Sequence, residues 1–499
     1  MSARHAYMAA AAAIVAVVAV VNLTAPTATA LPASDAWSHV AALDEWASDI
    51  TDPGHPHLAV TTPSARYIPP FLPLAALSDL FEWSAVTTFA LSAIMATALV
   101  TAVMYGFYRL LLPAEPWAPL VGLGLLLFGW GLATPWSGLF ELRSLVAVAG
   151  YPSAWGFVAG MAMVLAAARA ANDANKWWLG ATGLLSAIAM ISHPVSAMFT
   201  YSVAAVVAVD QGWRRFVAPG LAAVAGVVAA FAWPFFSLLD VVTEPLVFGE
   251  GDRLPIPFYS VGRVLAMVAP AFVGIYALAK LGGRRRLALV GGAVVMTVLW
   301  LANTVVVVPL GGRFLIYAVF YLHVAVVAWL LPWRRHLRAA EPAAVALRAV
   351  VAVLIVGHVF VLIADVGGKR FTVSGISDLP TTGETGIVNQ MEDIAAVVPD
   401  EAIVMADEVT GFVLPAFSGK VTAVRRDTFG VDDIEARVAD RDEFFAETTT
   451  PFRRVELLTD YKATLILFAP EDVGEVVSAD LEAMGRVIVA TPFFTLVTP

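Results

Sequence analysis

The sequence predicts an all-α, polytopic membrane domain over residues 1–365, followed by a small α/β domain over residues 366–499. Two features of the composition predict this division. First, 59% of the 499 residues are hydrophobic and only 14% are charged, whereas an average soluble domain carries roughly a quarter charged residues. Second, residues 366–499 carry 23 acidic and 11 basic side chains, while residues 1–365 carry 17 and 19. We therefore expect a nearly neutral membrane part and an acidic part in water.

The composition also excludes several classes of function. The chain has no cysteine, so disulfides, thiolate metal sites and a cysteine nucleophile are ruled out. The acidic second part disfavours nucleic acid as a partner, because phosphate binding needs a basic surface. The sequence contains no GxxxxGKS/T phosphate loop, no HExxH zinc motif and no GxSxG elbow. These absences separate the chain from nucleotide-driven pumps.

The membrane domain is predicted to contain about eleven membrane-spanning helices, because a crossing needs about 20 mostly apolar residues. The apolar runs lie at 6–24, 84–111, 117–135, 153–171, 177–192, 194–209, 216–235, 263–281, 287–308, 314–332 and 345–365. We take the first run as a retained anchor and not as a cleaved signal peptide, because the loop that follows it carries candidate site residues. The run at 177–192 is short and meets His193-Pro194, so it could also be half of a broken hairpin.

The positions of lysine and arginine predict a cytoplasmic N-terminus, because basic residues accumulate in cytoplasmic connections. Alternate connections carry Arg4; Arg109; Arg169 and Lys176; Arg214 and Arg215; Lys280 and Arg284 to Arg286; and Arg334, Arg335 and Arg338. An odd number of crossings then places the acidic domain outside the cell membrane. Two outside loops are long, the first at about 22–83 and the second at about 236–263.

The acidic domain alternates between apolar stretches and amphipathic stretches. Strands are predicted at 402–405, 421–424 and 463–468, and helices at 432–446 and 471–484. Such alternation indicates a small α/β domain.

The first outside loop carries most of the candidate polar chemistry. Residues 35–50 have the apolar spacing of an amphipathic helix, whose tryptophans could rest at the headgroups, and Asp35 and His39 share one face of it. Asp35 could also be a simple helix cap. The candidate ligands for a divalent cation such as Mg²⁺ or Mn²⁺ are Asp35, Asp44, His55 and His57; the alternative is a solvated acidic loop.

Three arginines, Arg143, Arg253 and Arg313, lie at the outside edge of apolar runs. A guanidinium donates two parallel hydrogen bonds to phosphate, so an anionic ligand is one interpretation. The other is snorkelling, or a salt bridge with a neighbouring acidic residue such as Glu141. His193 lies on the same side, where it could cap a helix, and Tyr259 could hydrogen-bond a polar ligand.

The arrangement resembles the GT-C superfamily of polytopic glycosyltransferases, which includes oligosaccharyltransferase catalytic subunits, protein mannosyltransferases and mycobacterial arabinosyltransferases. The resemblance covers the whole chain. It consists of the topology and of short signatures in this order: Asp35-Ala36-Trp37-Ser38-His39, Tyr67-Ile68-Pro69-Pro70-Phe71, Ser192-His193-Pro194 and Gly312-Arg313-Phe314. The tail lacks the Trp-Trp-Asp-Tyr-Gly motif, which disfavours N-linked oligosaccharide transfer.

The resemblance implies transfer of a sugar from a polyprenyl-phosphate carrier to a glycan, lipid or protein acceptor at the outer face of the plasma membrane. Asp35 would deprotonate the acceptor hydroxyl or hold a metal ion. Arg313, with Arg253, would bind the phosphate as its negative charge grows. The remaining substrate-binding candidates are His193, Tyr67, Tyr259 and His39.

Two other functions stay open. A transporter or flippase of lipid-linked saccharides would need ionisable residues at mid-membrane depth or an inverted repeat, and the sequence indicates neither. A non-catalytic assembly protein would use its acidic domain to dock partners.

Overall fold

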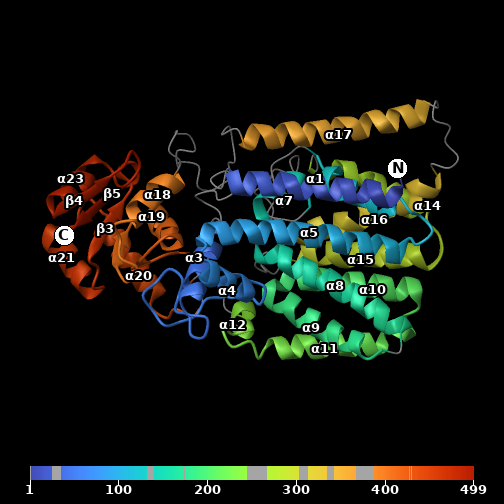
Figure 1. Cartoon of the computed structure of the whole chain (residues 1–499), viewed down its shortest axis with the longest axis horizontal. Coiled ribbons are helices and arrows are strands. Elements are labelled where there is room, and N and C mark those ends of the chain that lie inside the picture. The colour runs from blue at the N-terminus through green and yellow to red at the C-terminus, as the bar shows by residue number, and fades with distance from the viewer. Residues whose placement is uncertain are drawn as a thin grey trace. The chain divides into compact units, whose positions relative to one another are not determined.

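The computed structural model describes residues 2–24, 35–131, 140–173, 175–243, 267–302, 313–333, 342–366, 387–425, 428 and 430–499. They form two compact units (Figure 1). The membrane unit contains residues 1–24, 91–233 and 253–369, and the mixed unit contains residues 25–90, 234–252 and 370–499. The first long loop, which is predicted to lie outside, thus folds together with the C-terminal residues.

The membrane unit is a bundle of helices (Figure 1). Its main elements are α1 (Ala3–Thr24), α5 (Ala85–Leu111, of which residues 85–90 belong to the mixed unit), α6 (Ala118–Phe128), α7 (Leu142–Val148), α8 (Pro152–Asn172), α9 (Trp177–Ser192), α10 (Pro194–Gln211), α11 (Val217–Ala230), α14 (Val273–Lys280), α15 (Gly283–Ala302), α16 (Phe314–Trp333) and α17 (Pro342–Val366). Each predicted apolar run contains one of these helices.

Six helices in the described part of the chain are long and apolar enough to cross a membrane: Ala3–Leu23, Ala85–Leu111, Pro152–Asn172, Trp213–Ala230, Gly283–Ala302 and Phe314–Pro332. Shorter apolar helices include Ala118–Phe128, Trp177–Ser192, Ala269–Lys280 and Ala349–Ile363. The multi-pass character is therefore confirmed, while the number of crossings and their direction stay predictions.

One apolar run does not form the helix that was predicted. Helix α6 ends at Phe128, although the run extends to residue 135; residues 132–139 lie outside the described residues. Two histidines that are distant in sequence contact the carbonyls after this end. His323 lies 3.0 Å from the carbonyl oxygen of Gly129, and His358 lies 3.1 Å from that of Trp130. These contacts satisfy carbonyls that a continuing helix would otherwise bond.

Small residues let α9 and α11 approach closely, which gives a testable prediction. A Cβ on Gly226 would lie 2.0 Å from the carbonyl oxygen of Gly183 and 2.9 Å from the Cβ of Ser186. Gly226→Ala therefore forces the helices apart, and we expect it to cost about 1–3 kcal/mol and to lower the melting temperature. Gly220→Ala in the same helix is the control, because nothing lies within 4 Å of its Cβ. Equal melting temperatures for both variants would contradict the contact.

The C-terminal part of the mixed unit contains one five-stranded sheet. Its strands are β1 (Ile403–Ala406), β2 (Lys420–Val421), β3 (Leu465–Phe468), β4 (Arg486–Ala490) and β5 (Thr495–Thr498), in the order β2-β1-β3-β5-β4. Strands β2, β1 and β3 are parallel, and β5 is antiparallel to both β3 and β4. This confirms a small C-terminal sheet.

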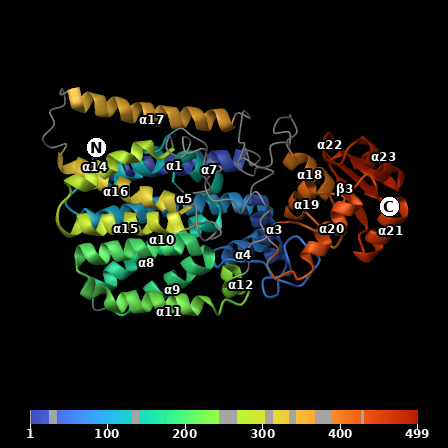
Figure 2. The same ribbon diagram turned by 180° about the vertical axis from the view of Figure 1, so that it is seen from behind.

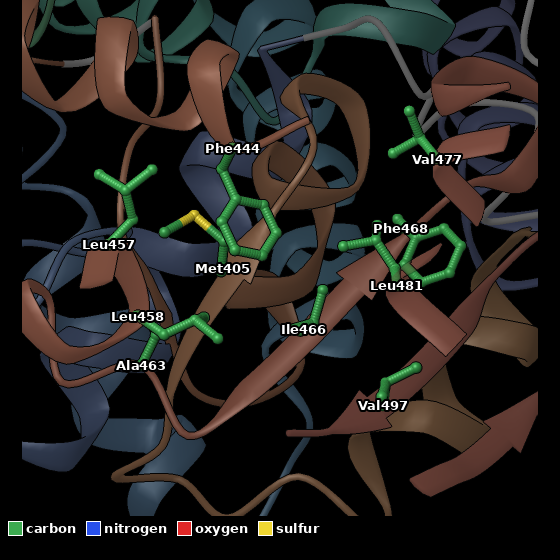
Figure 3. Close-up of a cluster of buried hydrophobic side chains, with 10 residues drawn as sticks. All are labelled: Met405, Phe444, Leu457, Leu458, Ala463, Ile466, Phe468, Val477, Leu481 and Val497. Carbon is green, nitrogen blue, oxygen red and sulfur yellow. The ribbon is translucent and has the colours of Figure 1, made fainter. Parts of the chain in front are cut away.

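Helices cover the sheet and enclose its apolar core. They are α18 (Ile387–Ala395), α19 (Glu408–Val413), α20 (Ile434–Phe444), α21 (Pro451–Asp460), α22 (Pro470–Val473) and α23 (Glu475–Ala483). Figure 3 shows Phe444 of α20, Leu457 of α21 and Met405 of β1 close together, with Ile466 and Phe468 of β3 in the same buried cluster. This burial explains why residues 403–406 and 465–468 form strands.

The same first long loop extends the edge of this sheet. It contributes α3 (Ala36–Ser48) and α4 (Phe71–Phe81), and Leu58 forms a parallel bridge with Val421. The ammonium of Lys420 contacts the carboxylate of Glu45 and donates to the carbonyl oxygens of His55 and Pro56 at 3.0 and 3.1 Å. These contacts join residues up to 375 positions apart, so the loop is an integral part of the mixed unit.

The expectation that tryptophans of this helix rest at the headgroups is wrong. Trp37 and Trp46 are fully buried. The ring of Trp37 lies 5.5 Å from that of Phe417, and the ring of Trp46 lies 5.1 Å from that of Tyr67 and 4.8 Å from that of Phe235. Packing against other parts of the mixed unit hides the apolar face that the periodicity had indicated.

Candidate functional site

The structure brings together two of the predicted site residues in the membrane unit. His193 lies between α9 and α10, and Arg313 directly precedes α16. The Nε2 atom of His193 lies 2.7 Å from the Nη1 atom of Arg313, although the residues are 120 positions apart. His193 is buried. Their predicted neighbours Arg253 and Tyr259 lie outside the described residues.

Both ring nitrogens of His193 face hydrogen-bond partners. Its Nδ1 atom lies 3.0 Å from the backbone nitrogen and 2.8 Å from the hydroxyl of Ser196, at the N-terminus of α10. The guanidinium of Arg313 can only donate, so Nε2 accepts from it, and the hydrogen of a neutral ring is then on Nδ1, where the hydroxyl of Ser196 can accept it. The imidazole thus orients the guanidinium, whose other N–H groups can donate to an anion.

Polar and aromatic side chains fix the position of His193. The hydroxyl of Ser196 lies 2.8 Å from the Nδ1 atom of His193 and 3.0 Å from the hydroxyl of Tyr317. The ring of Tyr317 stacks on that of Phe199 with centroids 4.2 Å apart. A Cβ on Gly156 would lie 2.8 Å from the Cβ of His193, so α8 packs directly against the histidine. The imidazole is therefore held in one orientation by three helices.

Ser196 and Tyr317 were not predicted from the sequence. His193-Pro194-Val195-Ser196 has the spacing of a helix N-cap, with proline at the first helical position, and this pattern could have identified Ser196. Tyr317 follows Arg313 by four residues and so lies on the same face of α16. No local pattern connects Tyr317 to Ser196.

Asp35 belongs to the mixed unit, where it occupies the N-cap position of α3. Its backbone is helical, its side chain makes no capping hydrogen bond, and it is half-buried. The capping interpretation therefore does not explain this carboxylate. Its carbonyl oxygen accepts the N–H of His39 at 3.2 Å, so the two residues are one turn apart, as predicted.

His39 lies in a buried position beside an arginine that was not predicted. Its Nε2 atom lies 3.4 Å from the Nη1 atom of Arg66, and because a guanidinium only donates, this nitrogen accepts. The ring stacks on Phe89 with centroids 6.1 Å apart. The guanidinium of Arg66 therefore lies beside His39, and His39 is one helical turn from Asp35 along α3.

Tyr67 is fully buried and closes the same loop. Its hydroxyl donates to the carbonyl oxygen of Gly54 at 2.6 Å, and its ring contacts Trp46 and Phe235. The structure thus gives Tyr67 a part in holding the loop.

The residues proposed as metal ligands do not gather into a site. The Nδ1 atom of His55 accepts the N–H groups of His57 and Leu58, both at 3.1 Å. His57 is fully buried and stacks on Phe412 with centroids 5.4 Å apart. Asp44 is exposed. Among the described residues, no group of three or more His, Asp or Glu side chains could hold a metal ion. Metal dependence stays a prediction.

Burial of His57 predicts a loss of stability in acid. Burial lowers the pKa of His57 well below the usual 6.5, and the nearby His55, Lys420 and Arg66 lower it further. The unfolded chain therefore takes up a proton below about pH 6.5 that the folded chain does not bind. Stability contributed by neutral His57 is present above this pH and is lost as the pH falls, by up to about 1.4 kcal/mol per pH unit.

His57→Phe removes the group that takes up this proton in the unfolded chain, and it keeps a ring that can stack on Phe412. We expect the variant's melting temperature to fall less than that of wild type between about pH 7 and pH 5. His5→Gln, at an exposed position, is the control and should follow wild type. Identical pH profiles for wild type and His57→Phe would exclude His57 as the titrating group.

Comparison with known proteins shows similarity in structure and not in sequence. No protein-family model matches the chain, and no curated protein sequence matches it significantly. The crystal structure of ArnT from Cupriavidus metallidurans is similar with a TM-score of 0.59 and 14% identity, over 99% of this chain and 98% of that chain.

Two other solved structures are similar over most of this chain. A variant of the arabinofuranosyltransferase AftD from Mycobacteria has a TM-score of 0.55 and 15% identity, over 97% of this chain but only 41% of AftD. The oligosaccharyltransferase of Archaeoglobus fulgidus has a TM-score of 0.52 and 12% identity, over 92% of this chain and 69% of the enzyme. The chain therefore has the fold of the GT-C glycosyltransferases, as the resemblance of its sequence implied.

Proposed function

We propose that the chain is an integral membrane glycosyltransferase that moves a sugar from a polyprenyl-phosphate-linked donor to an extracytoplasmic glycan, lipid or protein acceptor. One observation carries this proposal: the guanidinium of Arg313, oriented by Nε2 of His193 at 2.7 Å, lies at the end of apolar helices. A cation so placed suits a phosphate whose lipid lies in the membrane. The fold, shared with transferases, supports the same reaction class.

Arg313, positioned by His193, would bind the donor phosphate more strongly as the reaction proceeds. When the bond between the sugar C1 and the phosphate oxygen breaks, negative charge grows on the phosphate. Charge-assisted hydrogen bonds from preorganised donors strengthen with that charge and so lower the barrier. Ser196 and Tyr317 are positioning residues here, because they hold the imidazole and do not touch the ligand. Arg253 and Tyr259 would extend the donor site.

Asp35 would act as the base for the acceptor. The acceptor hydroxyl attacks the sugar C1 atom, its proton passes to the carboxylate, and the polyprenyl phosphate leaves with the electron pair of the broken bond. His39, one turn along α3, and Tyr67 would shape this side of the site.

The basic residues of alternate connections support a cytoplasmic N-terminus and an extracytoplasmic mixed unit. The protein would then reside in the plasma membrane with its site at the outer face. A protease that reaches only the outer face should cleave the exposed surface of the mixed unit in intact cells.

A transfer assay tests the proposed reaction. Membranes containing the protein are incubated with polyprenyl phosphates that each carry a different labelled sugar, and membranes without the protein serve as the control. We expect one label to become covalently attached to an acceptor, and its identity names the sugar. Movement of the labelled lipid between leaflets with no covalent transfer would indicate that the protein is a flippase and not a glycosyltransferase.

A further inference from the structure

A group of basic and aromatic side chains lies at one end of the membrane unit, apart from the candidate site. Arg169 lies in the last turn of α8, Trp177 begins α9, and a short 3₁₀ helix, η1 (Trp213–Phe216), directly precedes α11. The group, together termed the basic–aromatic cluster, consists of Arg169, Lys176, Trp177, Trp213 and Arg215. The proposed function uses none of these residues.

Helix packing brings the parts of this cluster to one level. Helices α9 and α11 lie side by side in both views (Figures 1 and 2). The hydroxyl of Ser186 donates to the carbonyl oxygen of Ala223 at 2.8 Å, and a Cβ on Gly183 would lie 3.1 Å from the carbonyl oxygen of Ala222. Gly183 is six residues after the start of α9, and Ala222 is five residues after the start of α11. The two helices therefore run parallel and begin at the same level, and η1 also contacts α8.

The three cations of the cluster are available to a ligand. All three are exposed, and none of them forms an ion pair with any residue that the structure describes. Two acidic residues lie close by in the sequence. The carboxylate of Asp173 accepts the backbone N–H of Asn175 at 3.2 Å, and that of Asp210 pairs with Arg285 at 3.3 Å. The cluster therefore carries a net positive charge.

The two tryptophans of the cluster indicate its depth in the membrane. Trp177 is 72% exposed and Trp213 is 61% exposed, and tryptophan is enriched where the hydrocarbon meets the headgroups. The guanidinium of Arg214 lies over the ring of Trp213, 5.8 Å from its centroid, so its charge is directed at that ring. From Trp177, α9 runs for 16 residues, about 24 Å, to the position before His193. The cluster therefore lies at the headgroups of the leaflet opposite the candidate site.

An exposed apolar stripe on α11 adjoins the cluster. Leu221, Val224 and Val228 are 66%, 60% and 66% exposed, and their spacing of three and four residues places them on one face of the helix. The stripe begins about one turn after the first residue of α11. A free anion would contact the cations and leave this stripe uncovered. A ligand that fits both surfaces has an anionic headgroup and apolar chains.

We propose that the basic–aromatic cluster binds the phosphate headgroup of an anionic phospholipid whose acyl chains lie along α11. The three cations attract the headgroup, and the two tryptophan rings lie among the neighbouring headgroups. A zwitterionic phospholipid binds less tightly, because its own cationic group is repelled by the cluster. The bound lipid fixes the depth of α9 and α11 in the membrane.

Native mass spectrometry of the whole protein tests this proposal. The protein in an uncharged detergent is mixed with equal amounts of phosphatidylglycerol and phosphatidylcholine, and the lipids that stay bound are counted. We expect one phosphatidylglycerol to be retained in preference. Lys176→Gln combined with Arg215→Gln should lower this preference by about 30-fold, since each basic residue near a membrane surface contributes about 1 kcal/mol.

Arg284→Gln combined with Arg286→Gln is the matched control. It also removes two exposed basic residues, which lie in the first turn of α15 and outside the cluster. They belong to another connection that is predicted to be cytoplasmic, so both double variants lose the same charge on the same predicted side. We expect the control variant to retain phosphatidylglycerol with the wild-type preference.

Three results would overturn the proposal. They are a wild-type protein that retains both lipids equally, an equal loss of preference in the two double variants, and displacement of the lipid by inorganic phosphate at the same concentration. The second would indicate a general attraction of anions to basic residues, and the third a site for free phosphate. Should the Lys176 and Arg215 double variant not fold, Arg169→Gln gives the same decision with a loss of about fivefold. None of these outcomes depends on sugar transfer.

Discussion

Asp35→Asn is expected to abolish sugar transfer, with a loss of about 10²–10⁴-fold in rate, while the protein still folds and enters the membrane. Asparagine keeps the size of the side chain but cannot take the proton of the acceptor hydroxyl. Transfer from a labelled donor in membranes measures the effect, and the melting temperature measures stability.

Asp49→Asn is the matched control for this substitution. Asp49 lies at the other end of α3, is exposed, and accepts the N–H of Thr51 with one carboxylate oxygen at 2.9 Å, a role that the amide oxygen of asparagine can keep. We expect this variant to transfer sugar at the wild-type rate. Wild-type activity in Asp35→Asn would show that Asp35 is not the base.

Arg313→Ala is expected to lower kcat/KM for the lipid-phosphate donor by about 10²–10³-fold. The substitution removes the cation that faces Nε2 of His193 and that would stabilise charge on the departing phosphate. Arg313→Lys should recover part of the loss, because lysine keeps the charge but not the forked geometry. Transfer rates measured at increasing donor concentration and a fixed acceptor concentration separate the effects on kcat and KM.

A double-substitution cycle checks that Arg313 acts together with His193. If His193 acts by positioning Arg313, Arg313→Ala combined with His193→Ala should cost less than the sum of the two single changes. Arg214→Ala is the control, since Arg214 is exposed and lies over the ring of Trp213 at 5.8 Å. Strict additivity, or unchanged use of the donor in Arg313→Ala, would contradict the phosphate site.

The helices of the membrane unit could be predicted from the sequence because their signal is local. Every apolar run contains a helix, since burial of consecutive apolar residues needs no distant partner. The end of α6 could not be predicted, because it depends on His323 and His358, which contact the backbone from about 190 to 230 positions away. Strand β4 was also missed, since its residues are mostly exposed or half-buried and lack clear alternation.

The candidate site was predicted only in part, because contacts between residues far apart in the sequence have no local signal. The order of short signatures indicated His193 and Arg313, but no spacing rule places them in contact. Arg66 was not recognised, because a single arginine in a polar loop resembles any solvated cation. The association of the first loop with β2 depends on Lys420 and Glu45, which only the folded chain brings together.

The site in the membrane unit depends most on Arg313, which is held by His193 and would bind the donor phosphate. An experimental structure with a non-transferable polyprenyl-phosphate sugar analogue tests this most directly. We predict a phosphate oxygen that accepts from the guanidinium of Arg313, while another nitrogen of that guanidinium stays in contact with Nε2 of His193. A phosphate bound away from Arg313 would contradict the proposed donor site.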